Sequence, residues 1–206
     1  MSGNYETPQE KFWAGDFGDE YIDRNNGPQL FSSNLALFSR IFGNARKIQS
    51  LIELGANVGL NLKAISYLFP GVDLAAVEIN EKAAQYLQSS LDAKVYHESI
   101  LNFVPDRKYD VALVKTVMIH IDPEFLPKVY ELLYRSSDRY ICIVEYYNPT
   151  PVEVTYRGHS ERLFKRDFAG EILDRYPDLR LVDYGFVYHR SSFPQDDVTW
   201  FLLEKC

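Results

Sequence analysis

Short apolar runs alternate along most of this chain with segments in which apolar side chains recur at helical spacing. From about residue 46 onward, five runs have the length and composition of buried strands; they cover residues 48–54, 73–79, 94–98, 109–114 and 140–146. Such alternation is typical of βαβ units, in which parallel strands share one sheet. The pattern therefore predicts an α/β domain.

Between the strands, three apolar stripes follow the spacing of helices that face a core. They are Leu62, Ile65 and Phe69, then Ala83, Ala84, Leu87 and Leu91, then Leu126, Val129, Tyr130 and Leu133. A further helix is predicted over residues 33–42. Asp122 followed by Pro123 suits the N-cap and first residue of the helix after the fourth strand. Each stripe predicts one helix packed on the sheet.

Two late β-rich runs, residues 179–188 and 198–203, follow each other without a segment of helix length between them. They predict an antiparallel pair at one edge of the sheet. The expected fold is thus a mostly parallel seven-stranded sheet with helices on both faces. A chain of 206 residues buries one sizeable core, and no linker or repeat divides it, so we expect a single domain over residues 1–206.

Composition narrows the class of partner. The formal net charge of −7 disfavours nucleic acid or an anionic membrane, because binding to phosphate needs a concentrated positive surface. No apolar run approaches the length that spans a bilayer, and residues 1–10 lack the features of a secretory signal. Cys142 and Cys206 form neither a metal-binding spacing nor a disulfide framework. We therefore expect a cytoplasmic protein without a metal centre that acts on a small molecule.

The segment with the most chemistry is the turn that ends the first strand, residues 53–59, which reads Glu-Leu-Gly-Ala-Asn-Val-Gly. Gly55 and Gly59 suit a tight turn and close helix packing, and Asn57 tolerates left-handed backbone angles. Open α/β sheets bind ligands at this carboxyl edge. The turn therefore predicts a glycine-rich cofactor loop.

The spacing in this loop discriminates between two kinds of cofactor. A dinucleotide loop has the pattern G-x-G-x-x-G, and here Asn57 and Leu60 replace the second and third glycines, so a pyrophosphate would meet a side chain. A methyltransferase loop has an acidic residue two positions before its first glycine, and Glu53, Gly55 and Gly59 match that pattern. Asn57 departs from it, but a sulfonium cofactor carries no phosphate. Glu53 suits the cationic methionyl end of S-adenosylmethionine.

Further positions extend the predicted cofactor site. Glu78 ends the second strand one βα unit later, where a carboxylate accepts hydrogen bonds from both ribose hydroxyls. The turn after the third strand is predicted to frame an adenine ring with Ser99 and Ile100. Ile79 and Lys115 complete the set of cofactor residues predicted on the sheet.

With these residues in place, the chain resembles the class I S-adenosylmethionine-dependent methyltransferases, and more narrowly the pseudaminic acid biosynthesis-associated methylases. The narrower resemblance rests on residues 12–25 (FWAGDFGDEYIDRN), and on residues 145–151 (EYYNPTP) continuing through 156–168. It implies a Rossmann-like class I methyltransferase fold, S-adenosylmethionine as cofactor, S-adenosylhomocysteine as product, and a role in carbohydrate biosynthesis.

Methyltransferases of this class commonly cover the cofactor with N-terminal residues. The resemblance therefore implies that residues 1–30 form a lid segment, with Tyr21 and Arg24 at the cofactor. In the alternative interpretation, Trp13, Phe17 and Tyr21 simply pack the N-terminus on the core.

Transfer to a sugar hydroxyl requires a base that takes the hydroxyl proton, and histidine is best matched to neutral pH. His120 follows the fourth strand, so we predict it as this base. Turnover should then rise with pH through an inflection between about 6 and 7.5, because an unperturbed histidine titrates near 6.5. The alternative is a structural histidine that caps the following helix. Tyr146, at the end of the fifth strand, is predicted to orient the acceptor. Tyr147, Arg157 and His159 are predicted to bind the acceptor.

The leading hypothesis is O-methylation of a sugar or nucleotide-sugar intermediate of the nonulosonic acid type in surface-glycan synthesis. N-methylation of an amino sugar or small amine is the alternative among enzymes, and replacement of His120 would then matter less. A cofactor-binding protein without transfer activity is the alternative outside them. A nicotinamide oxidoreductase is disfavoured by Asn57 and Leu60.

Overall fold

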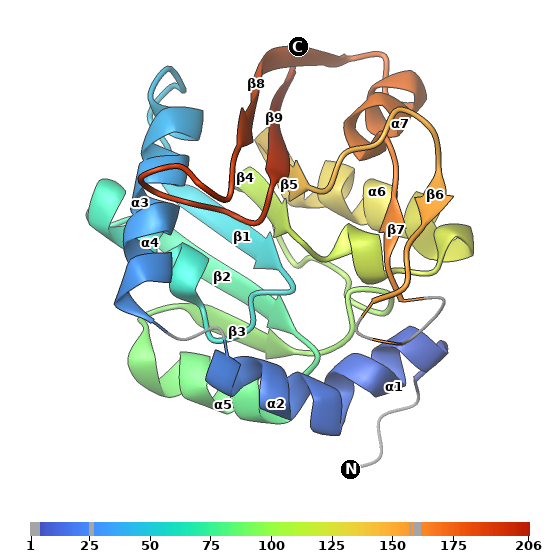
Figure 1. Ribbon diagram of the computed structural model, residues 1–206. Coiled ribbons are helices and arrows are strands. Elements are labelled where there is room, and N and C mark those ends of the chain that lie inside the picture. Colours follow the sequence, from blue (N-terminus) through green and yellow to red (C-terminus); the bar gives the residue numbers. More distant parts are fainter. Residues whose placement is uncertain (1–4, 25–26, 157, 159–161) are drawn as a thin grey trace.

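The central feature of the computed structural model is one seven-stranded sheet (Figure 1). The structure describes residues 5–24, 27–156, 158 and 162–206. The sheet has the order β3-β2-β1-β4-β5-β9-β8. Its strands are β1 (Ser50–Leu54), β2 (Asp73–Glu78), β3 (Lys94–His97), β4 (Tyr109–Lys115), β5 (Ser137–Glu145), β8 (Leu179–Val187) and β9 (Val198–Lys205). The first five are parallel, and the predicted antiparallel pair at one edge, β9 and β8, is confirmed.

Helices cover both faces of the sheet and bury two cores. One face carries α3 (Pro28–Phe42), α4 (Leu60–Leu68) and α5 (Glu81–Ser90), and the other carries α6 (Leu126–Ser136) and α7 (Phe168–Arg175). Successive residues of a strand point to opposite faces. Leu51 of β1 therefore packs in the core under α3 and α4, whereas Ile52 packs in the core under α6 and α7.

The structure differs from the prediction mainly outside the βα repeat. The N-terminal segment forms α1 (Pro8–Ala14) and α2 (Asp16–Arg24), and a small sheet of β6 (Val152–Glu153) and β7 (Phe164–Lys165) follows β5. These elements are short and only partly buried, so they carry no long apolar stripe. Two short 3-10 turns, η1 (Met118–His120) and η2 (Pro123–Phe125), follow β4. Asp122 caps η2 rather than α6, which begins at Leu126.

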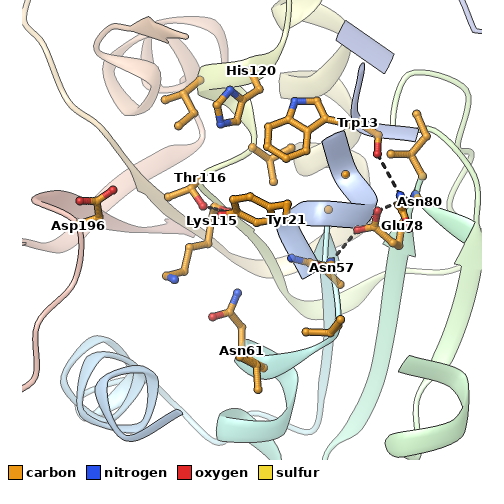
Figure 2. Close-up of a pocket in the computed structure, with 18 of the residues that line it drawn as sticks. Trp13, Tyr21, Asn57, Asn61, Glu78, Asn80, Lys115, Thr116, His120 and Asp196 are labelled. Atoms are coloured by element: carbon orange, nitrogen blue, oxygen red, sulfur yellow. Dashed lines mark hydrogen bonds between the residues drawn. The ribbon is translucent and has the colours of Figure 1, made fainter. Parts of the chain in front are cut away.

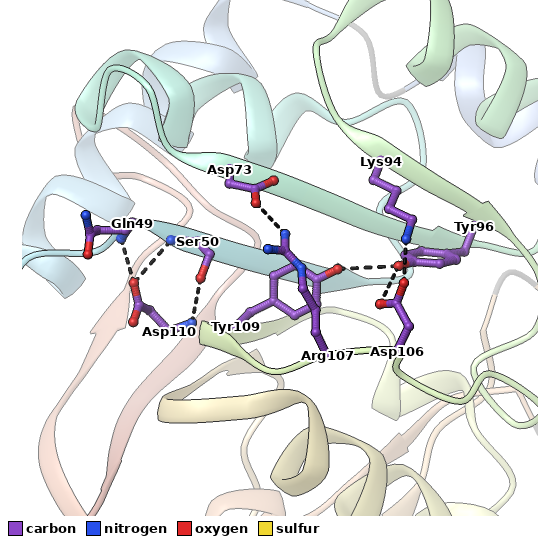
Figure 3. A network of polar contacts seen from close by, with 9 residues as sticks. All are labelled: Gln49, Ser50, Asp73, Lys94, Tyr96, Asp106, Arg107, Tyr109 and Asp110. Atoms are coloured by element: carbon purple, nitrogen blue, oxygen red, sulfur yellow. Dashed lines mark hydrogen bonds and ion pairs between the residues drawn. The ribbon is translucent and has the colours of Figure 1, made fainter.

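Polar side chains hold the amino ends of the central strands in register (Figure 3). The Asp110 carboxylate accepts hydrogen bonds from the backbone amides of Gln49 at 2.7 Å and Ser50 at 3.2 Å. The Ser50 hydroxyl in turn accepts from the Asp110 amide at 2.9 Å, and Arg107 pairs with Asp73 at 2.5 Å. Exposed ion pairs contribute little free energy, but the reciprocal contacts of Ser50 and Asp110 fix β1 against β4. The carboxyl ends of both strands are thereby aligned.

Two general classes of site have no counterpart in the described part of the chain. Across residues 5–24, 27–156, 158 and 162–206, no helix is long and apolar enough to cross a membrane. The same ranges contain no group of three or more histidine, cysteine or carboxylate side chains that could hold a metal ion. Cys142 is buried in β5 and Cys206 is exposed, and both are free thiols.

Candidate functional site

A cavity of about 550 Å³ lies at the carboxyl edge of the parallel strands (Figure 2). Its wall comes from the turns after β1, β2, β3 and β4, from α1 and α2, and from the loop that joins β8 to β9. Open α/β sheets bind ligands at this edge, and the volume is in the range of ligand sites. The predicted site residues that line the cavity are Tyr21, Gly55, Asn57, Glu78, Ile79, Ser99, Ile100, Lys115, His120 and Tyr146.

The turn after β1 has the left-handed backbone that its sequence predicted. Gly55, Asn57 and Gly59 have φ angles of 77°, 48° and 75°. A Cβ at Gly55 would lie 2.5 Å from Cγ2 of Val117, so the missing side chain lets the loop after β4 approach β1. A Cβ at Gly59 would lie 3.0 Å from Cγ of Leu87 on α5. Gly59 is not part of the cavity wall; it allows the start of α4 to pack beside α5.

Glu78 fastens this glycine loop to the next turn of the chain. Its side chain is buried, Oε2 accepts a hydrogen bond from the Asn57 amide at 2.6 Å, and Oε1 accepts one from the Asn80 amide at 2.8 Å (Figure 2). Burial raises the pKa of Glu78, and the backbone donors oppose that rise. Because each carboxylate oxygen has two lone pairs, both oxygens can accept one more hydrogen bond from a ligand.

Glu53 lies beneath the cavity rather than in its wall. Its Oε1 accepts a hydrogen bond from Nδ2 of Asn61 at 2.6 Å, whereas among the residues with described positions Oε2 has no hydrogen-bond partner. Burial raises the pKa of this carboxyl to about 8, and Asn61 and Lys115 act to lower it. Asn61 lines the cavity, so it links Glu53 to any ligand there. The sequence-based prediction missed Asn61, which lies in the first turn of α4.

Lys115 brings a cationic group to the same end of the cavity, where Figure 2 also shows Asn61. Burial lowers the pKa of its amine, and the charges of Glu53 and Glu145 oppose this effect. Glu145 accepts hydrogen bonds from two backbone amides of the loop after β4, both at 2.9 Å. The three side chains form one buried charge cluster between the ends of β1, β4 and β5.

The turn after β3 is held by the first helix. The Ser99 hydroxyl donates a hydrogen bond to Oε1 of Glu10 at 2.5 Å. The other oxygen of Glu10 accepts from the Thr7 amide at 2.7 Å, and the Thr7 hydroxyl accepts from the Glu10 amide at 3.1 Å, which completes a capping box. Glu10 also lines the cavity and was missed. The signal was present, because Thr-x-x-Glu is the signature of such a box.

Helices α1 and α2 bring aromatic rings to the cavity. Trp13 and Tyr21 both line it, and their ring centroids lie 5.2 Å apart in an edge-to-face arrangement. Nδ2 of Asn80 donates to the Trp13 carbonyl at 3.3 Å and to the Asp19 carboxylate at 2.9 Å. These rings therefore form part of the cavity wall and also pack against each other within the N-terminal segment. Arg24 is the last residue of α2.

His120 belongs to the cavity wall, as a buried imidazole. Its Nδ1 lies 2.6 Å from the carbonyl oxygen of Arg162; because a carbonyl only accepts, we assign the proton to Nδ1 and the lone pair to Nε2. The ring centroid lies 4.7 Å from that of Trp13 and 5.0 Å from that of Tyr156. Burial lowers the pKa of His120 to about 4, so the expected titration near 6.5 is wrong.

Tyr146 is fixed as a hydrogen-bond donor. Its hydroxyl donates to the carboxylate of Asp196, and the Lys165 ammonium lies 5.0 Å from the centroid of its ring. Burial and the Asp196 carboxylate raise the pKa of this phenol. Tyr146 therefore remains protonated near neutral pH, which suits an orienting role better than that of a base.

Of the other predicted acceptor residues, the structure describes only Tyr147. Tyr147 is exposed and lies outside the cavity lining, with its ring centroid 6.0 Å from that of Phe201. Arg157 and His159 lie outside the described residues.

The loop between β8 and β9 supplies a side of the cavity that the sequence did not predict. Figure 1 shows this loop reaching across toward α3. His189, Pro194, Gln195 and Asp196 line the cavity. Nε2 of Gln195 donates to Oδ1 of Asn34 on α3 at 3.0 Å, and both side chains are buried. An irregular loop has no periodicity, so its place in the site becomes visible only in three dimensions.

Comparison with known proteins identifies the fold. No protein-family model matches the chain, and no curated protein sequence matches it. It is similar to the plantazolicin methyltransferase BpumL in complex with SAH, with a TM-score of 0.67 at 17% identity over 96% of this chain and 93% of that one. It is also similar to magnesium protoporphyrin IX methyltransferase (ChlM) from Synechocystis PCC 6803 with bound SAM, with a TM-score of 0.70 at 14% identity over 99% and 100% of the two chains.

A third similar structure is the Burkholderia thailandensis 1,6-didemethyltoxoflavin-N1-methyltransferase with 1,6-didemethyltoxoflavin and S-adenosylhomocysteine. Its TM-score is 0.70 at 13% identity, over 100% of this chain and 93% of that one. Similarity at identities this low establishes the fold alone. The chain thus has the Rossmann-like fold of class I methyltransferases, as the resemblance implied.

Proposed function

We propose that this protein is an S-adenosylmethionine-dependent methyltransferase that acts on a small-molecule acceptor. The observation that carries the proposal is Glu78, a buried carboxylate in the cavity wall that grips the glycine loop and keeps lone pairs for two further donors. A cofactor with two neighbouring ribose hydroxyls supplies such donors. Solved structures of the same fold hold SAM or SAH, which supports this choice of cofactor.

The residues of the cavity fit each part of that cofactor. Glu78 and the Asn57 turn would hold the ribose, and Ile79, Ser99 and Ile100 would frame the adenine. Asn61, Lys115 and the underlying Glu53 would hold the methionyl group: Lys115 would pair with its carboxylate, and its ammonium would favour the ionised form of Glu53, whose pKa burial raises. The single domain would cover residues 1–206, with residues 1–30 as its lid and Trp13, Tyr21 and Arg24 over the cofactor.

Methyl transfer depends more on the alignment of the methyl donor with the acceptor than on stabilisation of new charge. When bound, S-adenosylmethionine presents an electrophilic methyl group, so the protein needs mainly to align an acceptor with it. Tyr146 and the lone pair on Nε2 of His120 would orient polar groups of the acceptor by hydrogen bonds. Both lie in the same wall as Trp13 and Tyr156, whose rings offer faces for a sugar to stack on.

For the acceptor we propose a hydroxyl of a sugar or nucleotide-sugar of the nonulosonic acid type in surface-glycan synthesis. The wall contains both polar groups and aromatic rings, which suits a sugar, and Arg157 and His159 would contact acidic groups of the substrate. N-methylation of an amino sugar and a binding role without transfer are the competing outcomes.

Direct binding tests the cofactor and product analysis tests the acceptor. Calorimetry of the full chain should give saturable binding of S-adenosylhomocysteine and none of NADH, and Glu78→Ala should weaken the former. Incubation with nonulosonic acids and their nucleotide conjugates should then give a product heavier by one methylene in mass spectrometry. Absence of binding refutes the cofactor, and methylation at nitrogen or no product in any incubation refutes the proposed acceptor.

A further inference from the structure

A histidine and an aspartate form a hydrogen-bonded pair at the rim of the cavity, in the loop between β8 and β9. His189 lines the cavity, and its Nδ1 lies 2.9 Å and 2.7 Å from the two carboxylate oxygens of Asp197. Because a carboxylate only accepts, we assign the ring proton to Nδ1. Nε2 then carries a lone pair that can accept a proton.

The pair is held in place by the backbone as well as by the ring. Oδ1 of Asp197 also accepts a hydrogen bond from the backbone amide of His189 at 2.9 Å. Asp197 itself has a φ angle of 52°, in the left-handed region that aspartate tolerates but rarely adopts. The loop is tied to α3 through Gln195 and Asn34 on one side of Asp197 and enters β9 at the buried Val198 on the other. The imidazole is thus oriented by a fixed turn.

Other charges surround the pair. Asp196, the neighbour of Asp197, accepts the hydroxyl of Tyr146, and Lys165 of β7 lies over the Tyr146 ring. The pKa of the Asp197 carboxyl is lowered first by the hydrogen bond from the His189 backbone amide, then by the His189 ring, and last by the positive charge of Lys165. Asp197 is therefore ionised near neutral pH and can balance a positive charge on the imidazole.

His120 offers a contrast within the same cavity. It is 7% exposed, and its Nδ1 is held by a neutral carbonyl, so a proton on its Nε2 would create a buried charge without a compensating partner. His189 is 46% exposed at its side chain and has a carboxylate partner. A proton taken by His189 is balanced by Asp197 and can leave to water.

We infer that His189, oriented by Asp197, is the group that takes the proton from an acceptor hydroxyl; this inference rests on the proposed methyltransferase function. As the acceptor oxygen bonds to the methyl carbon, the carbon–sulfur bond breaks and its electron pair stays on sulfur. The hydroxyl proton moves to Nε2 of His189, and the resulting imidazolium is stabilised by the Asp197 carboxylate. Water then removes that proton and restores the neutral ring. Asp197 is a positioning residue, since it acts only through the imidazole.

The test compares His189→Asn and Asp197→Asn with Arg190→Gln, a control at the exposed next residue, which does not line the cavity. Asparagine suits position 197, because it tolerates the left-handed backbone there. His189→Asn should lower methyl transfer to the hydroxyl acceptor found by mass spectrometry by about 100-fold or more. Asp197→Asn should lower it at least about tenfold, and Arg190→Gln should leave it unchanged. All three should bind S-adenosylhomocysteine and unfold thermally as the wild type does.

A second readout does not depend on turnover. In nitrogen-15 NMR spectra of the wild-type protein, His189 should be protonated at Nδ1 and carry its lone pair at Nε2, and Asp197→Asn should disturb that tautomer. Two results overturn this inference alone. One is a His189→Asn variant that transfers methyl groups within a few-fold of the wild-type rate. The other is a wild-type His189 ring that is protonated only at Nε2. A wild-type protein that binds no S-adenosylhomocysteine, or methylates no hydroxyl in the tested panel, overturns the proposed function and this inference with it.

Discussion

Gly55→Ala tests whether the glycine loop is set by space as well as by backbone angle. The residue has a φ of 77°, and an added Cβ would lie 2.5 Å from Cγ2 and 3.1 Å from Cγ1 of Val117. The left-handed backbone costs an alanine about 1–2 kcal/mol. Overpacking against Val117 costs about 1–3 kcal/mol more. The free energy of unfolding should therefore fall by about 2–5 kcal/mol.

Two further variants separate these contributions. Gly71→Ala is the matched control, because Gly71 has a φ of 80° but nothing lies within 4 Å of its added Cβ; it should cost only about 1–2 kcal/mol. Val117→Ala removes both methyl groups, and the nearest remaining atom to the Cβ at position 55 is then at 3.4 Å or beyond, an ordinary contact. Combining it with Gly55→Ala should recover about 1–3 kcal/mol relative to the sum of the single changes.

The assay is urea unfolding of the four variants and the wild type, followed by calorimetry with S-adenosylhomocysteine on those that fold. Gly55 and Val117 both line the cavity, so Gly55→Ala should also weaken binding of that ligand and the double variant should regain part of the loss. A cost of Gly55→Ala no larger than that of Gly71→Ala, or a double variant without coupling, would show that contact with Val117 does not limit position 55.

Three other predictions follow from the site. Glu78→Gln should weaken binding of S-adenosylmethionine by about 10- to 150-fold in calorimetry, because an amide cannot replace a carboxylate that accepts from both turns; unchanged affinity would exclude Glu78 from the site. His120 should titrate near 4 by NMR. Because histidine in the unfolded chain takes up its proton near pH 6.5, the contribution of His120 to the free energy of unfolding should be complete above pH 6.5. It should fall by about 3 kcal/mol as the pH drops to 4. His120→Asn should flatten that slope, and an equally steep slope in the variant would contradict the assignment. Helices α1 and α2 should gain protection from hydrogen exchange when S-adenosylhomocysteine binds; identical exchange with and without it would favour the packing interpretation.

The sequence predicted the sheet because its central strands are buried on both faces and its helices carry regular stripes. Gly55, Asn57 and Glu78 were found for the same reason, since each directly follows or ends a recognisable strand. Gly59 and Glu53 were identified by type, yet they act one layer below the cavity. The sequence pattern predicts which residues lie at the carboxyl edge of the sheet. It does not predict which of them line the cavity and which lie beneath it.

The missed residues share a different cause. His189 and Asp196 lie in an irregular loop, and their chemistry arises only where that loop meets β5 and α3. The lowered pKa of His120 is likewise collective, because the burial comes from Trp13, Tyr156 and the chain at Arg162, which are distant in sequence. Glu10 is the exception, since its capping box was legible in the sequence.

The dual role of the Glu10 carboxylate has a consequence for how the N-terminus behaves. A helix of 7 residues is unstable alone in water, because so short a segment does not recover the cost of nucleation. The carboxylate that caps α1 is the same group that receives the Ser99 hydroxyl. Formation of α1 and its attachment to the turn after β3 are therefore one cooperative transition. If α1 detaches from that turn, the start of the helix unfolds, and if the helix unfolds, Ser99 loses its hydrogen-bond partner. A ligand that orders Ser99 would thus also raise the helix content of a segment nearly ninety residues away in sequence.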